Sequence, residues 1–213
     1  MTSPPTLHDL PLFPLGTVLF PGGLLPLRIF EVRYLDMIRR CQAAGTPFGV
    51  VCLTQGHEVR QAGAPQERFA EVGTLARLLE VEAPQPGLLM IRAEGLQRFR
   101  LRRSGQLKHG LWVGDAELLP DDLPVPVPDD LKDTGLALAQ VLERLRAQAA
   151  RAGALSPVAE PWHLEDCGWV ANRWCELLPL APALKQQLLE LDTPLLRLEL
   201  VGDVLSRHGQ AGD

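Results

Sequence analysis

The apolar positions near the start of the chain come in short runs that proline and glycine interrupt. Residues 10–34 read LPLFPLGTVLFPGGLLPLRIFEVRY. Short runs rich in Leu, Val, Ile and Phe between such breakers favour short strands joined by tight turns. In the FPGG turn, Pro21 presets its own φ and Gly22 can adopt a positive φ. Because a membrane-spanning helix needs about 20 apolar residues without repeated breakers, this stretch is not predicted to cross a membrane.

The period becomes helical after Glu31. Val32, Leu35 and Ile38 fall on one helical stripe, which Gln42 continues with some drift. The pattern predicts a short helix that is ended by Gly45 and Pro47. The side chains expected to point away from the apolar stripe are those of Arg33, Arg39 and Arg40.

Strand patterns return in the next 70 residues, and apolar and charged positions alternate in several of them. Phe99 and Leu101, for example, alternate with arginines. We expect consecutive, antiparallel strands that form a curled sheet or a small barrel. The segments are FGVVCL at 48–53, VGTLARLLEVE at 72–82, GLLMIRAEGLQRFRLRR at 87–103 and LWVGDAELL at 111–119.

A proline-rich segment, PDDLPVPVPDD at 120–130, marks the main boundary in the chain. Its prolines forbid a helix and favour an extended connector. Beyond it, apolar residues such as Leu138 and Leu142 follow a helical period. Further helices are expected from Pro161 to Leu178, from Pro182 and from Pro194. The predicted fold class is therefore α+β, with a β-rich lobe at 7–123, a helical lobe of about four helices at 124–208 and a disordered tail at 209–213.

Composition and charge narrow the class of partner. The chain of 213 residues is 46% hydrophobic and has a formal net charge of −5, which argues against bulk attraction to nucleic acid or to an anionic membrane. No secretory signal is visible, so a cytoplasmic protein is expected. The four cysteines have no CxxC spacing and are expected to be reduced, buried thiols.

Residues typical of catalysis do not form a recognisable set. The three lysines are followed by His, Asp and Gln, so none fits the GK[ST] end of a P-loop, and GxSxG is absent. His163, Glu165, Asp166 and Cys167 lack a second ligand pair at i, i+4, so they are interpreted as a polar first helical turn. We therefore predict no enzymatic activity, no cofactor and no metal site.

Three segments in order resemble the Lon substrate-binding domain, which is the N-terminal domain of the ATP-dependent protease Lon and also occurs as a free-standing bacterial protein. The first is the opening stretch at 10–34, similar to the family pattern of LPLFPL, FPG, PL and IFE-x-RY. The second is VGTLARLLEVEAPQPGLLMIRAEGLQRFRL, with its GT and EGLQR elements. The third is CELLPLAPALKQQLLELDTPLLRLELVGDVL, which resembles the closing helices.

The resemblance implies a PUA-like β lobe, a helical C-terminal lobe and binding of polypeptide. The chain departs from the family at Arg28, where free-standing members often have His, and at Val32, where they often have Pro. The serines lie in no context that matches the Ser-Lys dyad of the family's peptidase. The predicted function is therefore a non-catalytic module that binds unfolded or exposed apolar polypeptide, or a protein partner.

Two sets of residues are candidates for partner binding. The first set is Arg28, Glu31, Arg33 and Tyr34. Within it, Glu31, Arg33 and Tyr34 either fix the strand-to-helix junction by hydrogen bonds and ion pairs or contact a ligand. Trp162, Trp169 and Trp174 are expected within one helix, where they either pack between the lobes or leave one ring as a partner anchor. An alternative function is RNA binding, in which arginines on one strand contact phosphates. The other interpretation of the same arginines is the solvated, charged face of a half-buried strand. The residues are Arg98, Arg100, Arg102 and Arg103.

Overall fold

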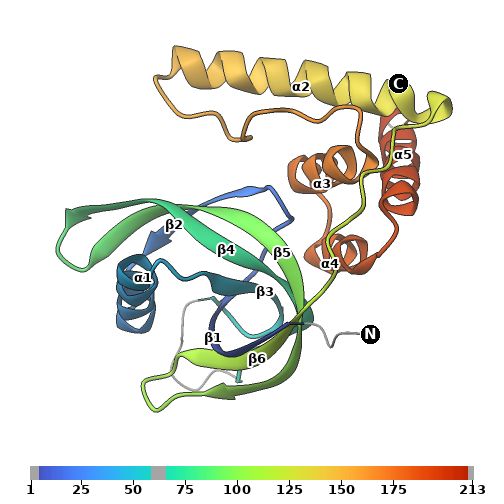
Figure 1. Cartoon of the computed structure of the whole chain (residues 1–213). Coiled ribbons are helices and arrows are strands. Elements are labelled where there is room, and N and C mark those ends of the chain that lie inside the picture. The colour runs from blue at the N-terminus through green and yellow to red at the C-terminus, as the bar shows by residue number, and fades with distance from the viewer. Residues whose placement is uncertain (1–4, 59–65, 211–213) are drawn as a thin grey trace. The chain divides into compact units, whose positions relative to one another are not determined.

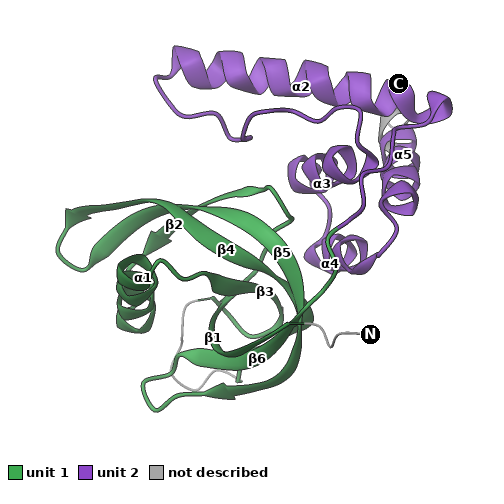
Figure 2. Cartoon of the chain, in the orientation of Figure 1, with its two compact units in different colours: residues 1–121 green, residues 122–213 purple. Residues whose placement is uncertain are grey.

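Two units make up the structure, one built mainly of strands and one of helices (Figure 2). The computed structural model describes residues 5–58 and 66–210. The first unit spans 1–121 and the second 122–213. The predicted α+β class is confirmed. Of the tail expected to be disordered, residues 209–210 are at the end of the last helix, and residues 211–213 lie outside the described residues.

The β unit is a six-stranded sheet whose order is β2-β5-β4-β3-β1-β6. Because β6 also pairs with β5, five of the strands close into a barrel, and β2 is left beside the long β4–β5 hairpin (Figure 1). The consecutive strands β3, β4, β5 and β6 pair antiparallel, as expected. The pairing of β1 with β3, which the sequence did not predict, is parallel, and β2 and α1 provide the crossover that a parallel pair requires. The elements are β1 (Thr6–Leu15), β2 (Leu24–Ile29), α1 (Val32–Ala44), β3 (Phe48–Gln55), β4 (Arg68–Gln85), β5 (Leu88–Gln106) and β6 (Trp112–Leu118).

A tight turn places the start of β2 on β5. Gly22 has φ 74°, and the N–H of Gly23 donates to the carbonyl of Phe20 at 3.0 Å, which confirms the turn predicted from FPGG. The turn is hydrogen-bonded to Gly95 of β5: the N–H of Gly22 donates to the carbonyl of Gly95, and the N–H of Gly95 donates to the carbonyl of Gly23, both at 2.8 Å. A Cβ at Gly95 would lie 2.2 Å from the carbonyl oxygen of Phe20, so only glycine permits this approach.

Helix α1 is rotated relative to the stripe read from the sequence. Its buried face includes Tyr34, Leu35 and Ile38, but Val32 is 71% exposed and Arg33 is buried. The predicted inward position of Val32 and outward position of Arg33 are therefore wrong. The reason is that Tyr34 stacks on Phe13 of β1, with ring centroids 4.0 Å apart, and this aromatic contact fixes the rotation of the first turn.

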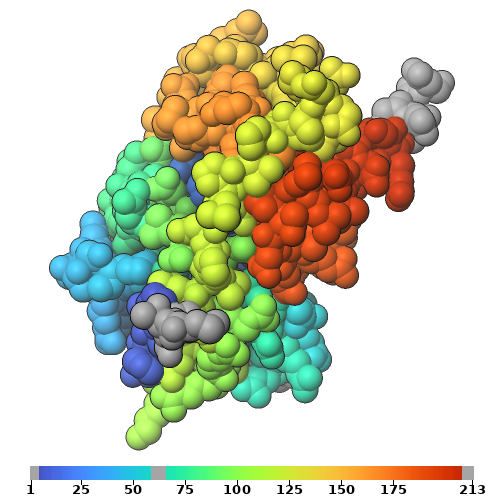
Figure 3. All heavy atoms as spheres, turned by 45° about the vertical axis from the view of Figure 1, so that its right-hand side comes forward, coloured from blue at the N-terminus to red at the C-terminus, as the bar shows by residue number. Residues whose placement is uncertain are grey.

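Within residues 122–210, the helical unit contains four helices, in agreement with the prediction of about four, and a short 3-10 turn that was not predicted. The chain from 122 to 127 belongs to this unit and is hydrogen-bonded to the segment before α3: the N–H of Val127 donates to the carbonyl of Glu165 at 2.9 Å, and that of Cys167 donates to Val125 at 2.8 Å. Figure 3 shows the connector in yellow-green along the red C-terminal helices. The elements are η1 (Asp129–Leu131), α2 (Lys132–Arg151), α3 (Cys167–Leu177), α4 (Pro182–Glu190) and α5 (Pro194–Gln210).

Helix α3 begins at Cys167, so the prediction of a helix from Pro161 is wrong. Asp166 is its N-cap, and its carboxylate accepts hydrogen bonds from the N–H of Trp169 at 2.8 Å and from the N–H of Val125 at 3.0 Å. The cap and the pairing with the connector hold the preceding residues outside the helix. Trp162 therefore does not share a helix with Trp169 and Trp174, and the two-turn spacing expected between Trp162 and Trp169 does not exist.

A buried arginine, Arg197 of α5, joins three other parts of the helical unit. Its guanidinium donates to the carbonyl of Leu188 at 2.9 Å, to Leu191 at 2.5 Å, to the side chain of Asn172 at 3.0 Å and to the carboxylate of Asp122 at 2.5 Å. The residue is 1% exposed. These contacts connect α5 with the end of α4, with α3 and with the connector.

We expect Arg197→Leu to lower the free energy of unfolding by about 3–5 kcal/mol, because it removes one partner of a buried ion pair and leaves the others unsatisfied. Urea denaturation followed by circular dichroism measures the change. The matched control is Arg207→Leu, an exposed arginine on the same helix, which should change stability by less than about 0.5 kcal/mol. Equal losses for the two variants would contradict this role of Arg197.

Trp174 is a core residue of this unit. Its ring is 6% exposed, and its Nε1 donates to the carbonyl of Thr134 on α2 at 3.0 Å. Trp169, by contrast, is only partly buried. Trp174 is therefore buried inside the helical unit and is not a partner anchor, whereas the ring of Trp169 is partly exposed.

Trp174→Ala should destabilise the chain by about 3–5 kcal/mol, since it removes a large buried side chain. Trp174→Phe retains most of the ring volume, so it should be destabilised much less than Trp174→Ala. The loss that remains measures the hydrogen bond to Thr134, which is worth about 1 kcal/mol. Urea melts followed by circular dichroism compare both variants with Trp169→Ala. A loss for Trp169→Ala as large as that for Trp174→Ala would show that both rings are core.

Candidate functional site

Arg33 fixes the junction between β2 and α1. Its Nε donates to Glu31 at 3.2 Å, and its terminal nitrogens donate to Glu67 at 3.2 Å and to the carbonyl of Gly110 at 3.0 Å. Glu67 also accepts from the indole Nε1 of Trp112 at 2.9 Å. Of the contacts predicted at the junction, the ion pair between Glu31 and Arg33 is therefore present.

Tyr34 completes this junction from the other side. The Arg33 guanidinium lies 4.5 Å from the centre of the Tyr34 ring, which in turn stacks on Phe13. Burial holds the pKa of Tyr34 well above its usual range, so the phenol stays neutral. Arg33 and Tyr34 are both buried, which assigns them to the frame and takes them out of direct reach of a partner. Sequence reasoning missed Glu67, because nothing in its neighbourhood marks it as a partner 34 residues away.

Apolar side chains are exposed next to this buried cluster in the sequence and on β5, the strand that pairs with β2. Phe30 is 52% exposed, Val32 71% and Met90 41%. Arg28, also exposed, is the register partner of Met90, and directly paired residues share a face of the sheet. We call these four residues, Arg28, Phe30, Val32 and Met90, the junction face. Phe30 and Met90 were not among the residues singled out from the sequence, although Phe30 lies within the quoted IFE motif.

The strand that carries the junction face is poorly suited to pairing with an added strand. β2 is an edge strand, and Pro26, at its centre, pairs with Arg92 of β5. A proline in a paired edge strand fits where the missing N–H faces away from the partner strand. The free edge of β2 therefore lacks a donor at its centre, and side chains rather than the backbone are left to make contacts.

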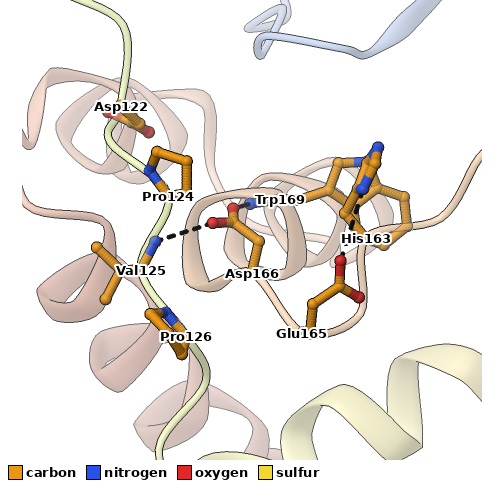
Figure 4. A pocket seen from close by; sticks show the side chains of 8 residues that line it. All are labelled: Asp122, Pro124, Val125, Pro126, His163, Glu165, Asp166 and Trp169. Carbon is orange, nitrogen blue, oxygen red and sulfur yellow. Dashed lines mark hydrogen bonds and ion pairs between the residues drawn. The ribbon is translucent and has the colours of Figure 1, made fainter.

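A concave surface lies within the helical unit (Figure 4). One cavity of 470 Å³ is lined by the connector at Asp122 and 124–126 and by His163, Glu165, Asp166 and Trp169. Another, of 410 Å³, is lined by the first turns of α2 and by Leu164. Both cavities share Pro126 and Glu165. We call the two together the connector groove.

Most charged groups of the connector groove already have partners. Asp122 is paired with Arg197, Asp166 caps α3, and Lys132 lies 2.6 Å from Asp129. Glu165 lies 3.7 Å from Nδ1 of His163, and its side chain is 79% exposed. Figure 4 shows the Glu165 carboxylate and the His163 ring together, next to Trp169. Glu165 is thus the carboxylate best placed to meet a ligand.

The three tryptophans are placed differently from one another. Trp169 lines the connector groove, edge-on to the His163 ring. Trp162 is partly buried, with the guanidinium of Arg146 5.3 Å from its ring centre. Trp174 is in the core. The structure therefore does not bring them together into one aromatic surface.

The arginine strip on β5 is largely neutralised by its neighbours. Arg98 is 4% exposed, so its expected position on a charged face in water is wrong. Arg102 pairs with Glu117, and Arg103 with Asp115, both on β6. The hydrogen bond from Arg103 holds the pKa of Asp115 below its usual range. Arg100, which is partly exposed, sits opposite Glu117 in the register. This geometry does not favour contacts to a run of phosphates.

The thiols are not placed for nucleophilic chemistry. Each of the four cysteines is free and buried, and burial raises the pKa of every one, that of Cys175 to about 12. Within residues 5–58 and 66–210, no cluster of three His, Cys, Asp or Glu side chains is arranged to hold a metal ion. In the same part of the chain, no helix is both long and apolar enough to cross a membrane.

Similar proteins share this architecture over nearly the whole chain. The crystal structure of a Lon N-terminal domain protein from Xanthomonas campestris is 32% identical, with a TM-score of 0.68 over 92% of this chain and 97% of that one. The N-terminal domain of the Mycobacterium avium complex Lon protease is 18% identical, with a TM-score of 0.59 over 94% and 99% of the two chains, and shows the fold alone.

A curated relative is much longer. The Lon protease of Anaeromyxobacter dehalogenans is 26% identical over 204 residues, which cover 93% of this chain and 23% of that protein. The chain thus spans about a quarter of the length of the Lon proteases that it matches. The model of the ATP-dependent protease La (LON) substrate-binding domain matches residues 9–207. With this match, and with the barrel and helices described above, the chain belongs to the family of LON substrate-binding domains.

Proposed function

We propose that this chain is a non-catalytic module that binds unfolded polypeptide, or exposed apolar segments of a partner protein, through the junction face. The observation that carries the proposal is the exposure of Phe30 and Val32 immediately beside Arg33 and Tyr34, which are buried. Apolar side chains gathered on a rigid frame and bordered by charge are typical of interaction surfaces. The name of the family, a substrate-binding domain, supports the same role.

The frame explains how such exposure is tolerated. Arg33 is held by Glu31, Glu67 and the carbonyl of Gly110, so the backbone on either side of Val32 is fixed without burial of Phe30 or Val32. A preformed apolar surface loses little conformational freedom when a partner binds. The charged border consists of Arg28 and of the pair Arg92–Glu80, at 2.9 Å, on the neighbouring strands.

The proposed role does not include chemistry. The chain contains no P-loop sequence, and its thiols are buried with raised pKa values. RNA binding, the other candidate, is less well supported, because Arg102 and Arg103 are paired with carboxylates and Arg98 is buried. Expression in the cytoplasm, where unfolded chains are produced, is part of the proposal.

The double variant Phe30→Ser, Val32→Ser should weaken binding of an unfolded protein at least about tenfold, since each truncated apolar contact is worth about 1–2 kcal/mol. The probe is fluorescently labelled lactalbumin, reduced and carboxymethylated so that it stays unfolded, and fluorescence anisotropy measures the Kd. Because both side chains are exposed, the free energy of unfolding should change by less than about 1 kcal/mol.

Leu155→Ser is the matched control, since Leu155 is 63% exposed but belongs to the helical unit and does not line the connector groove. It should bind the probe like the native chain. Native, folded lactalbumin should not compete. The proposal fails if the native chain does not prefer the unfolded form, or if the double variant binds the unfolded form as tightly as the control does.

A further inference from the structure

The connector groove has a chemical character different from that of the junction face. Residues 122–213 contain 14 acidic and 8 basic residues, a formal charge of −6, whereas residues 1–121 contain 12 acidic and 13 basic residues, a charge of +1. The acidic excess of the chain is thus confined to the unit that contains the groove. We therefore expect the groove to select a ligand that has apolar groups and carries a positive charge.

Among the carboxylates that line the groove, one is best placed to meet a ligand. The carboxylate of Asp122 is occupied by Arg197, and that of Asp166 by two backbone N–H groups. Glu165, 79% exposed, lies at a position shared by both cavities, and among the residues that the structure describes its carboxylate contacts only His163, at 3.7 Å. A carboxylate between two apolar cavities is suited to a basic group that has apolar groups on both sides.

We propose that the connector groove binds an extended polypeptide segment in which a lysine or arginine, paired with Glu165, is flanked by an apolar side chain for each cavity. Side chains two positions apart lie on the same face of an extended chain and about 6.6 Å apart. The recognised pattern is therefore an apolar residue at i, a basic residue at i+2 and an apolar residue at i+4. The prolines of the connector and the Trp169 ring form apolar walls, which suit such side chains.

This inference rests on the proposed function, because it names the class of polypeptide that a second surface of the same module selects. The two surfaces predict different salt dependence. Binding to the junction face is dominated by apolar contact, so it changes little with salt, whereas pairing with an exposed Glu165 weakens as ionic strength rises. The two can therefore be tested separately.

The test uses the full chain and three labelled peptides that share Gly-Ser flanks. Their central sequences are Leu-Ser-Lys-Ser-Leu, Leu-Ser-Glu-Ser-Leu and Gly-Ser-Lys-Ser-Gly, and fluorescence anisotropy measures binding up to about 1 mM peptide. The native chain should bind the first peptide at least about tenfold more tightly than either of the others, which corresponds to at least about 1.4 kcal/mol. Comparable affinity for the lysine and glutamate peptides, or no saturable binding of any of them, would overturn the inference.

Charge reversal identifies the groove as the site. In Glu165→Lys the order should invert, so that the glutamate peptide binds more tightly than the lysine peptide. Asp203→Lys introduces the same charge change at an exposed position of α5 that does not line the groove, and it should keep the native order. If both variants, or neither of them, lost the preference for the lysine peptide over the glutamate peptide, the assignment to Glu165 would be contradicted.

Failure of this inference is distinguishable from failure of the proposed function. The Phe30→Ser, Val32→Ser variant should lose affinity for unfolded lactalbumin while it retains the native order of the three peptides. If unfolded lactalbumin binds through the junction face but no peptide preference is seen, only the groove is disproved. If the peptides follow the expected order but unfolded lactalbumin is not bound, the proposed function is disproved.

Discussion

A buried guanidinium must find acceptors for its donors, and this requirement organises both units. In the β unit, Arg33 meets it with Glu31, Glu67 and the carbonyl of Gly110. These acceptors come from the start of α1, from the segment before β4 and from the turn before β6, so one side chain holds together parts of the chain that are far apart in sequence. In the helical unit, Arg197 has the corresponding role. Removal of either guanidinium leaves buried acceptors unpaired.

The candidate surfaces depend on these two arginines. Phe30 and Val32 are exposed next to Arg33, whose side chain is buried and hydrogen-bonded to Glu31, Glu67 and Gly110. The connector groove depends on Arg197 through Asp122, which ties the proline-rich segment to α5. Asp166 then joins that segment to the start of α3. In both units a buried polar network shapes a neighbouring apolar surface.

The two surfaces are proposed to select different features of a polypeptide. The junction face is apolar with a border of mixed charge, which fits recognition of exposed hydrophobic side chains irrespective of sequence. The connector groove adds a carboxylate between two cavities in an acidic unit, which fits recognition of a short pattern. A binding module with one permissive and one selective surface can retain many unfolded chains and still rank them.

Local chemistry allowed much of the fold to be predicted from the sequence. Turn residues identified the bend at 20–23, prolines identified the starts of α4 and α5, and alternation identified the strands. These features depend on contacts between residues close in the chain. The ordered motifs also pointed to the family, and the match over residues 9–207 confirms it.

Only the tertiary structure decided which side chains are exposed. Helical spacing alone gave Val32 an inward position and Arg33 an outward one, but the stacking of Tyr34 on Phe13 and the distant acceptor Glu67 reversed them. In the same way, Pro161 suggested a helix start, whereas the contact of Asp166 with Val125, 41 residues away, delayed it to Cys167. The sequence by itself therefore determined the elements and their order, while long-range hydrogen bonds and ring packing, which no local pattern encodes, determined the surfaces available to a partner.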